Sequence, residues 1–155
     1  MAACGSAMGR RTLAGSLRRM ASDPDCIFCK IVAGELPATK IDEDDRTIAF
    51  MDINPGTHGH ALVIPKEHAR DLLEIEPDEL AAVMQAAQRL AKRMPEALGA
   101  EGVNLINSCG AVAWQTVFHF HVHVIPRYSY DTARLPWIPG DGGERLNDAA
   151  EALRA

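Results

Sequence analysis

The feature that most constrains the fold of this chain is a run at residues 117–125 in which histidines alternate with apolar residues. The run is Val-Phe-His-Phe-His-Val-His-Val-Ile. Successive side chains of an extended strand point to opposite faces. The alternation therefore predicts a strand with one buried apolar face and one face that carries His119, His121 and His123.

A row of three imidazoles has three interpretations. Isolated histidines in strands are ordinarily structural, but chance rarely places three at strict alternation. A metal shared by all three conflicts with geometry. Side chains two apart on a strand are separated by about 6.7 Å, and each ligand nitrogen must come within about 2 Å of a metal. Catalysis on a phosphate chain fits best, because imidazole is neutral and nucleophilic near pH 7.

Length and charge favour one globular domain that binds a small anion. The chain has 155 residues and a formal net charge of −5, although residues 1–22 hold four arginines and no acidic residue. A surface that follows a nucleic-acid backbone needs clustered positive charge, and a membrane-spanning helix needs about eighteen or more apolar residues. Neither pattern is present, so we expect no nucleic-acid partner and no membrane partner.

Residues 1–22 differ in composition from the rest of the chain. They are rich in Ala, Gly, Ser and Arg, as in an organellar transit peptide. The alternatives are a disordered extension, or a start assigned upstream of Met20. We expect the folded domain to occupy residues 23–155. No hydrophobic signal-peptide core precedes the cysteines, which favours a reducing, cytoplasmic location over a disulfide framework.

The remaining elements indicate an α+β domain. Asp23-Pro24 predicts the start of a short helix over Cys26–Val32 that ends at Gly34, and Pro77 begins one long helix. Strands are expected around residue 40 and at 47–51, 60–64, 103–107 and 117–125, and a second short helix at 144–154.

Three blocks of sequence together resemble the histidine triad family. They are CIFCKIVAGELP, FMDINPGTHGHALVIPKEH and the triad block QTVFHFHVHVIPR, within residues 25–127. The nearest branch contains nucleoside-phosphoramidate and dinucleotide hydrolases, including bacterial members with a Cys-x-x-Cys. The resemblance implies an antiparallel twisted sheet of about five strands with one long and one or two short helices. It also implies a homodimer formed across the long helix and the sheet, and a C-terminal loop and short helix at 128–155.

The resemblance also implies the catalytic residues. His121 would attack the α-phosphorus of a purine nucleotide and form a nucleotidyl-histidine intermediate, which water then hydrolyses. His123 would bind the phosphate and assist the leaving group, and His60 would lie beside the triad as a fourth histidine.

The nucleotide-binding residues come from the same resemblance. Polar contacts to the phosphates are implied for Ser108, Gln115 and Thr116, and contacts to the ribose hydroxyls for Asp52. The apolar slot for the base corresponds to Phe28, Leu36, Phe50 and Leu62, whose residue types alone fit an ordinary core better. The chain departs from the family pattern at Ser108, where many relatives have Asn, and at Trp114, where many have Gly.

A zinc site is the one cofactor that the resemblance implies. Cys26 and Cys29 are half of such a site, and zinc-binding relatives complete it with residues that match His68 and His119. Four protein ligands close the coordination sphere, so the zinc would be structural. The alternatives are a pair of partly buried thiols or a redox Cys-x-x-Cys. No organic cofactor is expected.

Four functions are compatible with these residues. The first is a nucleoside phosphoramidase, and the second is a dinucleoside polyphosphate hydrolase. The third is a nucleotide-binding regulatory module whose turnover is incidental, and the fourth is a zinc-centred metallohydrolase. Tight nucleotide binding without turnover would favour the third, and activity that survives complete zinc removal would exclude the fourth.

Overall fold

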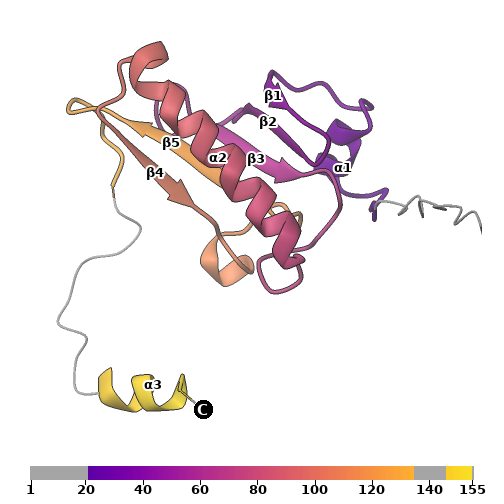
Figure 1. Ribbon diagram of the computed structural model, residues 1–155, viewed down its shortest axis with the longest axis vertical. Coiled ribbons are helices and arrows are strands. Elements are labelled where there is room, and N and C mark those ends of the chain that lie inside the picture. The colour runs from indigo at the N-terminus through magenta and orange to yellow at the C-terminus, as the bar shows by residue number, and fades with distance from the viewer. Residues whose placement is uncertain (1–20, 135–145, 155) are drawn as a thin grey trace, which may run out of the picture.

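A five-stranded antiparallel sheet in the order β1-β2-β3-β5-β4 forms the centre of the molecule (Figure 1). We describe it from a computed structural model over residues 21–134 and 146–154. The strands are β1 (Lys40–Glu43), β2 (Thr47–Met51), β3 (Ala61–Pro65), β4 (Gly102–Ile106) and β5 (Val122–Arg127). The helices are α1 (Ile27–Val32), α2 (Pro77–Leu98), the 3-10 helix η1 (Ala111–Ala113) and α3 (Leu146–Ala152). The predicted α+β class is confirmed.

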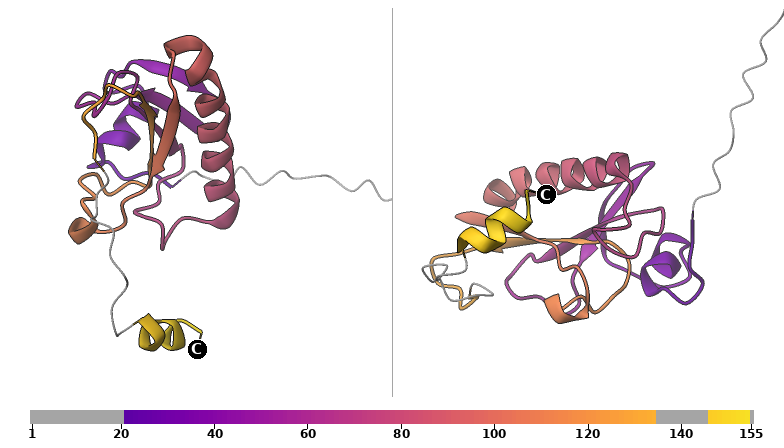
Figure 2. Two further views of the ribbon diagram at one scale, coloured as in Figure 1. Left: turned by 90° about the vertical axis from the view of Figure 1, so that its left-hand side faces the viewer. Right: turned by 90° about the horizontal axis from the view of Figure 1, so that it is seen from below.

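The two faces of the sheet have different partners. Side chains alternate along each strand, so Ala49 and Val63 belong to the core with α2, whereas Phe50 and Leu62 belong to the core with α1. Figure 2 shows these two helices on opposite sides of the sheet. His123 is paired with Leu62 in the β3–β5 ladder and therefore faces the α1 side. The candidate functional side chains lie on this α1 face.

Helix α2 is the predicted long helix and packs against the other face. It begins at Pro77, whose missing N–H is harmless in a first turn, and Asp78 and Glu79 there suit the positive end of the helix dipole. It ends at Gly99, whose φ of 68° lies in the left-handed region that glycine favours. The buried side chains recur at helical spacing and are Val83, Ala86, Ala87, Leu90 and Met94.

The predicted strand at 117–125 is only partly correct. β5 begins at Val122, and residues 117–121 approach it in a bent conformation. Continuing the β3–β5 register would place Phe120 opposite Pro65, which has no N–H to donate. The carbonyl oxygen of Pro65 instead accepts a hydrogen bond from Nε2 of His119, at 2.9 Å. The ladder therefore ends at Val122, and His119 and His121 both lie outside it.

Two smaller predictions are also wrong. Phe118 was expected on the buried apolar face but is 40% exposed, and the guanidinium of Arg70 lies 5.0 Å from the centre of its ring. The N-cap of α1 is Cys26, not Asp23. The carboxylate of Asp23 instead accepts a hydrogen bond from the backbone N–H of Asp25, within a turn that precedes the helix.

Some predictions fall outside the described residues. These are most of the extension at 1–22, much of the irregular stretch after Arg127, and the first two residues of the helix expected at 144–154. Within the described part of that helix, α3 begins at Leu146. Among the helices of the described residues, none is both long and apolar enough to cross a membrane.

Candidate active site

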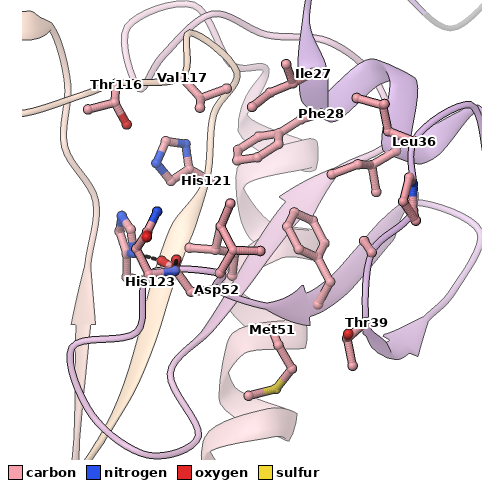
Figure 3. Close-up of a pocket in the computed structure, with 17 residues that line it drawn as sticks. Ile27, Phe28, Leu36, Thr39, Met51, Asp52, Thr116, Val117, His121 and His123 are labelled. Atoms are coloured by element: carbon pink, nitrogen blue, oxygen red, sulfur yellow. Dashed lines mark hydrogen bonds and ion pairs between the residues drawn. The ribbon is translucent and has the colours of Figure 1, made fainter.

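A cavity of about 590 Å³ opens on the α1 face of the sheet. The predicted base slot lines it with all four of its apolar side chains: Phe28, Leu36, Phe50 and Leu62. Asp52, Thr116, His121 and His123 line the same cavity, as Figure 3 shows. The structure therefore brings together an apolar wall, a carboxylate and two of the three alternating histidines.

The hydrogen bond of its ring fixes the protonation of His121. The residue is 4% exposed, and its Nδ1 lies 2.7 Å from the backbone carbonyl oxygen of His119. Because a carbonyl oxygen only accepts, Nδ1 carries the proton and donates it. The neutral ring then has its free lone pair on Nε2. The ring of Phe28 packs edge-on against the imidazole, with centroids 5.4 Å apart, and holds its plane.

The side chains of Asp52, His60 and His123 lie close together in the site. Nε2 of His60 lies 2.9 Å from Nδ1 of His123, and the Oδ2 atom of Asp52 lies 3.6 Å and 3.7 Å from these two nitrogens. His60 is 6% exposed and does not line the cavity, whereas His123 does. His60, the fourth histidine, therefore contacts His123 on the side away from the cavity.

Burial keeps these imidazoles neutral. Loss of solvent lowers the pKa of His121 below its ordinary value and lowers the pKa of His60 in the same way. The pKa of His123 falls to about 4, because burial and the neighbouring His121 and His60 outweigh the opposing charge of Asp52. A neutral His121 is a competent nucleophile, since its lone pair is not occupied by a proton.

In the loop before β5, Thr116 faces the cavity whereas Gln115 bonds to the protein itself. Thr116 lines the cavity. The amide of Gln115 is committed to the loop itself, because it donates to the carbonyl oxygens of Arg70 and Val117 and accepts from the N–H of Gly110. Neither Gln115 nor Ser108 is among the residues that line the cavity. Gln115 thus shapes the loop that carries Thr116.

Residue-by-residue reading of the sequence missed Asn107. Its Nδ2 donates to the backbone carbonyl oxygen of His121 at 2.8 Å, and its buried Oδ1 has no hydrogen-bond partner among the described residues. The asparagine follows β4, which pairs with β5 up to His123. A polar residue at the end of the strand expected beside the triad was the available signal.

His119 leaves the row and joins a second cluster. Its ring is fully buried, and its Nδ1 lies 3.5 Å from Sγ of Cys26, 3.6 Å from Sγ of Cys29 and 3.3 Å from Nδ1 of His68. Nδ1 of His68 also lies 3.3 Å from Sγ of Cys29. All four ligand atoms lie within 4.8 Å of one another, so residues from three separate parts of the chain form one compact group.

The four ligand atoms of this cluster fit a tetrahedral zinc ion. With Zn–N bonds of about 2.0 Å and Zn–S bonds of about 2.3 Å, neighbouring donors are separated by about 3.3–3.8 Å. The observed separations of 3.3–3.6 Å match that spacing. His119 donates its Nε2 proton to Pro65, which leaves Nδ1 as the lone-pair donor toward the cluster. Burial raises the pKa of the Cys26 thiol, so a thiolate there needs a nearby positive charge.

Two curated relatives have named activities. The adenosine 5'-monophosphoramidase hnt1 of Schizosaccharomyces pombe is 43% identical over 102 residues, which cover 66% of this chain and 74% of that protein. The adenylylsulfatase HINT3 of Arabidopsis thaliana is 42% identical over 107 residues, which cover 69% of this chain and 54% of that protein.

Solved structures share the fold. The structure of SMU.412c from Streptococcus mutans superposes with a TM-score of 0.81 at 38% identity, over 99% of this chain and 98% of that chain. A zinc-bound histidine triad family protein from Mycobacterium smegmatis superposes with a TM-score of 0.69 at 40% identity, over 84% and 96% of the two chains. The family model described as the HIT domain matches residues 33–130. The resemblance seen in the sequence is therefore confirmed, and this chain belongs to the HIT domain family.

Proposed function

We propose that this protein hydrolyses purine nucleotide conjugates at the α-phosphorus, with nucleoside phosphoramidates as its main substrates and His121 as nucleophile. The observation that carries the proposal is the hydrogen bond from Nδ1 of His121 to the carbonyl oxygen of His119. It assigns the free lone pair to Nε2 of a buried, neutral imidazole in the cavity. The phosphoramidase and adenylylsulfatase activities named for two relatives support it.

The proposed reaction has two displacements at phosphorus. In the first, Nε2 of His121 forms a bond to phosphorus, the bond from phosphorus to the leaving group breaks, and the leaving group takes up a proton. In the second, a water oxygen forms a bond to phosphorus, the phosphorus–nitrogen bond breaks, and the water releases a proton. The overall change is hydrolysis, and His121 returns to its neutral form.

The rest of the cavity would hold the nucleotide. The apolar wall of Phe28, Leu36, Phe50 and Leu62 suits a flat base. Asp52 lines the same cavity, and we assign it to the ribose hydroxyls and Thr116 and His123 to the phosphates. Because Gln115 and Ser108 do not line the cavity, we give them a supporting role in this loop.

Steady-state kinetics on a substrate panel tests the function. The panel contains adenosine phosphoramidates, adenylylated lysine, diadenosine tri- and tetraphosphate, and the guanosine equivalents. We expect the highest kcat/KM for the phosphoramidates. A higher value for the dinucleotides would assign the protein as a dinucleoside polyphosphate hydrolase. Tight nucleotide binding with negligible turnover of every compound would contradict the enzymatic proposal and favour a regulatory module.

We also propose that zinc occupies the Cys26, Cys29, His68 and His119 cluster. The fit of the donor spacing and the zinc-bound relative from Mycobacterium smegmatis support this assignment. Four protein ligands leave no position for a metal-bound water, so the ion would stabilise the fold rather than join the reaction. It would hold α1 to the segment that carries the triad, because the two cysteines and His119 come from these two parts of the chain.

The homodimer remains a proposal that rests on the sheet. β4 is an edge strand in the order β1-β2-β3-β5-β4, so one side of its backbone pairs with no other strand of the described residues. Leu105 of this strand is 42% exposed. We propose that two copies join through this edge and the adjacent face of α2. Multi-angle light scattering should give twice the chain mass, and a monomeric mass at micromolar concentration would contradict the proposal.

A further inference from the structure

We infer that His60 is a positioning residue that fixes the tautomer of His123, so that His123 presents an Nε2–H donor to the cavity. The catalytic effect of this tautomer rests on the proposed function, whereas the tautomer itself follows from hydrogen bonds alone. The atoms that carry it form one chain of hydrogen bonds from the backbone of the β2–β3 loop to the cavity wall.

The chain begins at a donor that has only one state. The backbone N–H of Gly56 points at Nδ1 of His60, with a separation of 3.0 Å. A backbone amide always donates, so Nδ1 of His60 must be the acceptor and carries no proton. A neutral imidazole has one proton, and the proton of His60 is therefore on Nε2.

The hydrogen bond between His60 and His123 then sets the tautomer of His123. Nε2 of His60 lies 2.9 Å from Nδ1 of His123, which is an ordinary hydrogen-bond length. Because Nε2 of His60 is the donor, Nδ1 of His123 is the acceptor. The proton of neutral His123 is then on Nε2, the ring nitrogen that does not face His60. His123 lines the cavity, so this N–H is available to a substrate oxygen or leaving group.

A metal ion is the competing interpretation of these residues. Asp52, His60 and His123 bring three ligand atoms within 4.8 Å of one another. A metal bound by Nε2 of His60 would require the proton on Nδ1. That proton would point directly at the N–H of Gly56, 3.0 Å away. The loop amide therefore favours the hydrogen-bonded arrangement and disfavours a metal.

The arrangement explains how His123 can assist at neutral pH while uncharged. With a pKa near 4 the ring is almost entirely neutral at pH 7, so its contribution depends on which nitrogen carries the single proton. The Nε2–H tautomer donates to the cavity, and the Nδ1–H tautomer would present a lone pair there. Only the first stabilises negative charge that develops on phosphate oxygens or on a leaving group.

Nitrogen-15 NMR of histidine-labelled full-length protein at pH 7.5 without substrate tests the tautomers directly. Both His60 and His123 should show a protonated, pyrrole-type Nε2 and an unprotonated, pyridine-type Nδ1, with assignments made from single-residue variants. A protonated Nδ1 on either ring would overturn the inference. This measurement is independent of turnover, so it separates a failure of the inference from a failure of the proposed function.

Two nearly isosteric substitutions test the consequence. In His60→Gln the amide nitrogen can replace Nε2 as donor, and kcat should stay within about threefold of the parent. In His60→Glu, assayed from pH 7 to pH 9.5 because burial and Asp52 both raise the pKa of the new carboxyl, the side chain accepts instead once it is ionised. His123 should then change to the Nδ1–H tautomer, and kcat should fall by about 10²-fold or more. His58→Gln, an exposed histidine of the same loop, is the matched control.

The comparison between the variants decides the outcome. Equal losses in His60→Gln and His60→Glu would show that the imidazole itself is needed and would overturn the donor role. An unchanged kcat in His60→Glu would overturn it as well. If His60→Glu does not fold, His60→Leu removes the donor without adding charge and should lose activity to a similar extent.

Discussion

Nδ1 of His121 donates its proton to the backbone carbonyl oxygen of His119, across 2.7 Å. The ring of His119 faces the cysteine cluster, and its backbone orients the candidate nucleophile. One residue thus connects the proposed zinc site to the proposed reaction centre. The connection runs through the backbone of His119, because its two ring nitrogens bind Pro65 and face the cysteine cluster.

Replacing His121 with glycine should abolish the covalent intermediate. The parent protein, mixed with an α-labelled nucleotide conjugate and quenched in base, should retain label as an acid-labile phosphohistidine. His121→Gly should lose both the label and at least about 10³-fold in kcat, because the bond from Nε2 to phosphorus can no longer form. Full turnover by the folded variant would contradict the assignment.

Truncation of His123 should slow the reaction without preventing binding. His123→Ala removes a half-buried imidazole from the cavity, and kcat should fall by about 10²–10⁴-fold. The fold should survive, because the side chain lines the cavity. Circular dichroism and the melting temperature check this. A loss below about threefold would mean that His123 has no direct role.

Asp52→Asn should change selectivity for the sugar. The carboxylate lines the cavity directly after β2, and its Oδ1 already accepts the N–H of Asn54 at 2.7 Å, which holds the side chain in place. Asparagine keeps this shape but loses the charge-assisted bonds to ribose hydroxyls. The Kd for ribonucleotides should rise by about tenfold, against a smaller change for 2′-deoxy analogues. An equal effect on both classes would assign Asp52 a structural role.

Zinc removal should affect stability more than catalysis. Protein purified without a metal-binding tag should contain close to one zinc per chain by elemental analysis. Cys26→Ser should abolish that zinc and lower the melting temperature, because α1 loses its link to the triad segment.

Two results would contradict this structural role. One is a zinc-free parent protein whose two clustered thiols are freely alkylated. The other is a strict zinc requirement for turnover in protein shown to be folded without the metal, which would favour the metallohydrolase. Otherwise the folded fraction of Cys26→Ser should keep measurable hydrolysis.

Stability should fall as the solution is acidified from pH 6.5 toward pH 4. An unfolded histidine binds a proton near pH 6.5, whereas His123 in the folded chain does so only near pH 4, because it is buried. Between these values the unfolded state binds more protons and is favoured. His123→Gln should reduce the slope of the unfolding free energy by up to about 1.4 kcal/mol per pH unit.

Urea denaturation at pH 7, 6 and 5 measures this slope. His58→Gln removes an exposed histidine from the β2–β3 loop and is the matched control. The prediction fails if both variants change the slope by the same amount. Histidines near the proposed zinc site are unchanged in either variant, so metal binding does not confound the comparison.

The sequence alone determined the α+β class, the long helix and the family. These depend on local signals: short apolar runs in β2 and β3, two-residue alternation in β5, and the proline and glycine that bound α2. The sequence also predicted residues that meet in space: all four apolar residues of the proposed base slot line one cavity with Asp52 and His121.

The resemblance implied that His119 joins the cysteines, but only the tertiary structure decided which contacts each histidine ring makes. Local alternation predicts one row of three, yet Pro65 ends the ladder, and His119 meets cysteines 93 and 90 residues away in the chain. The tautomer of His123 depends on His60, 63 residues away. Such assignments follow from which donors and acceptors meet in space, and periodicity along the chain carries no information about them.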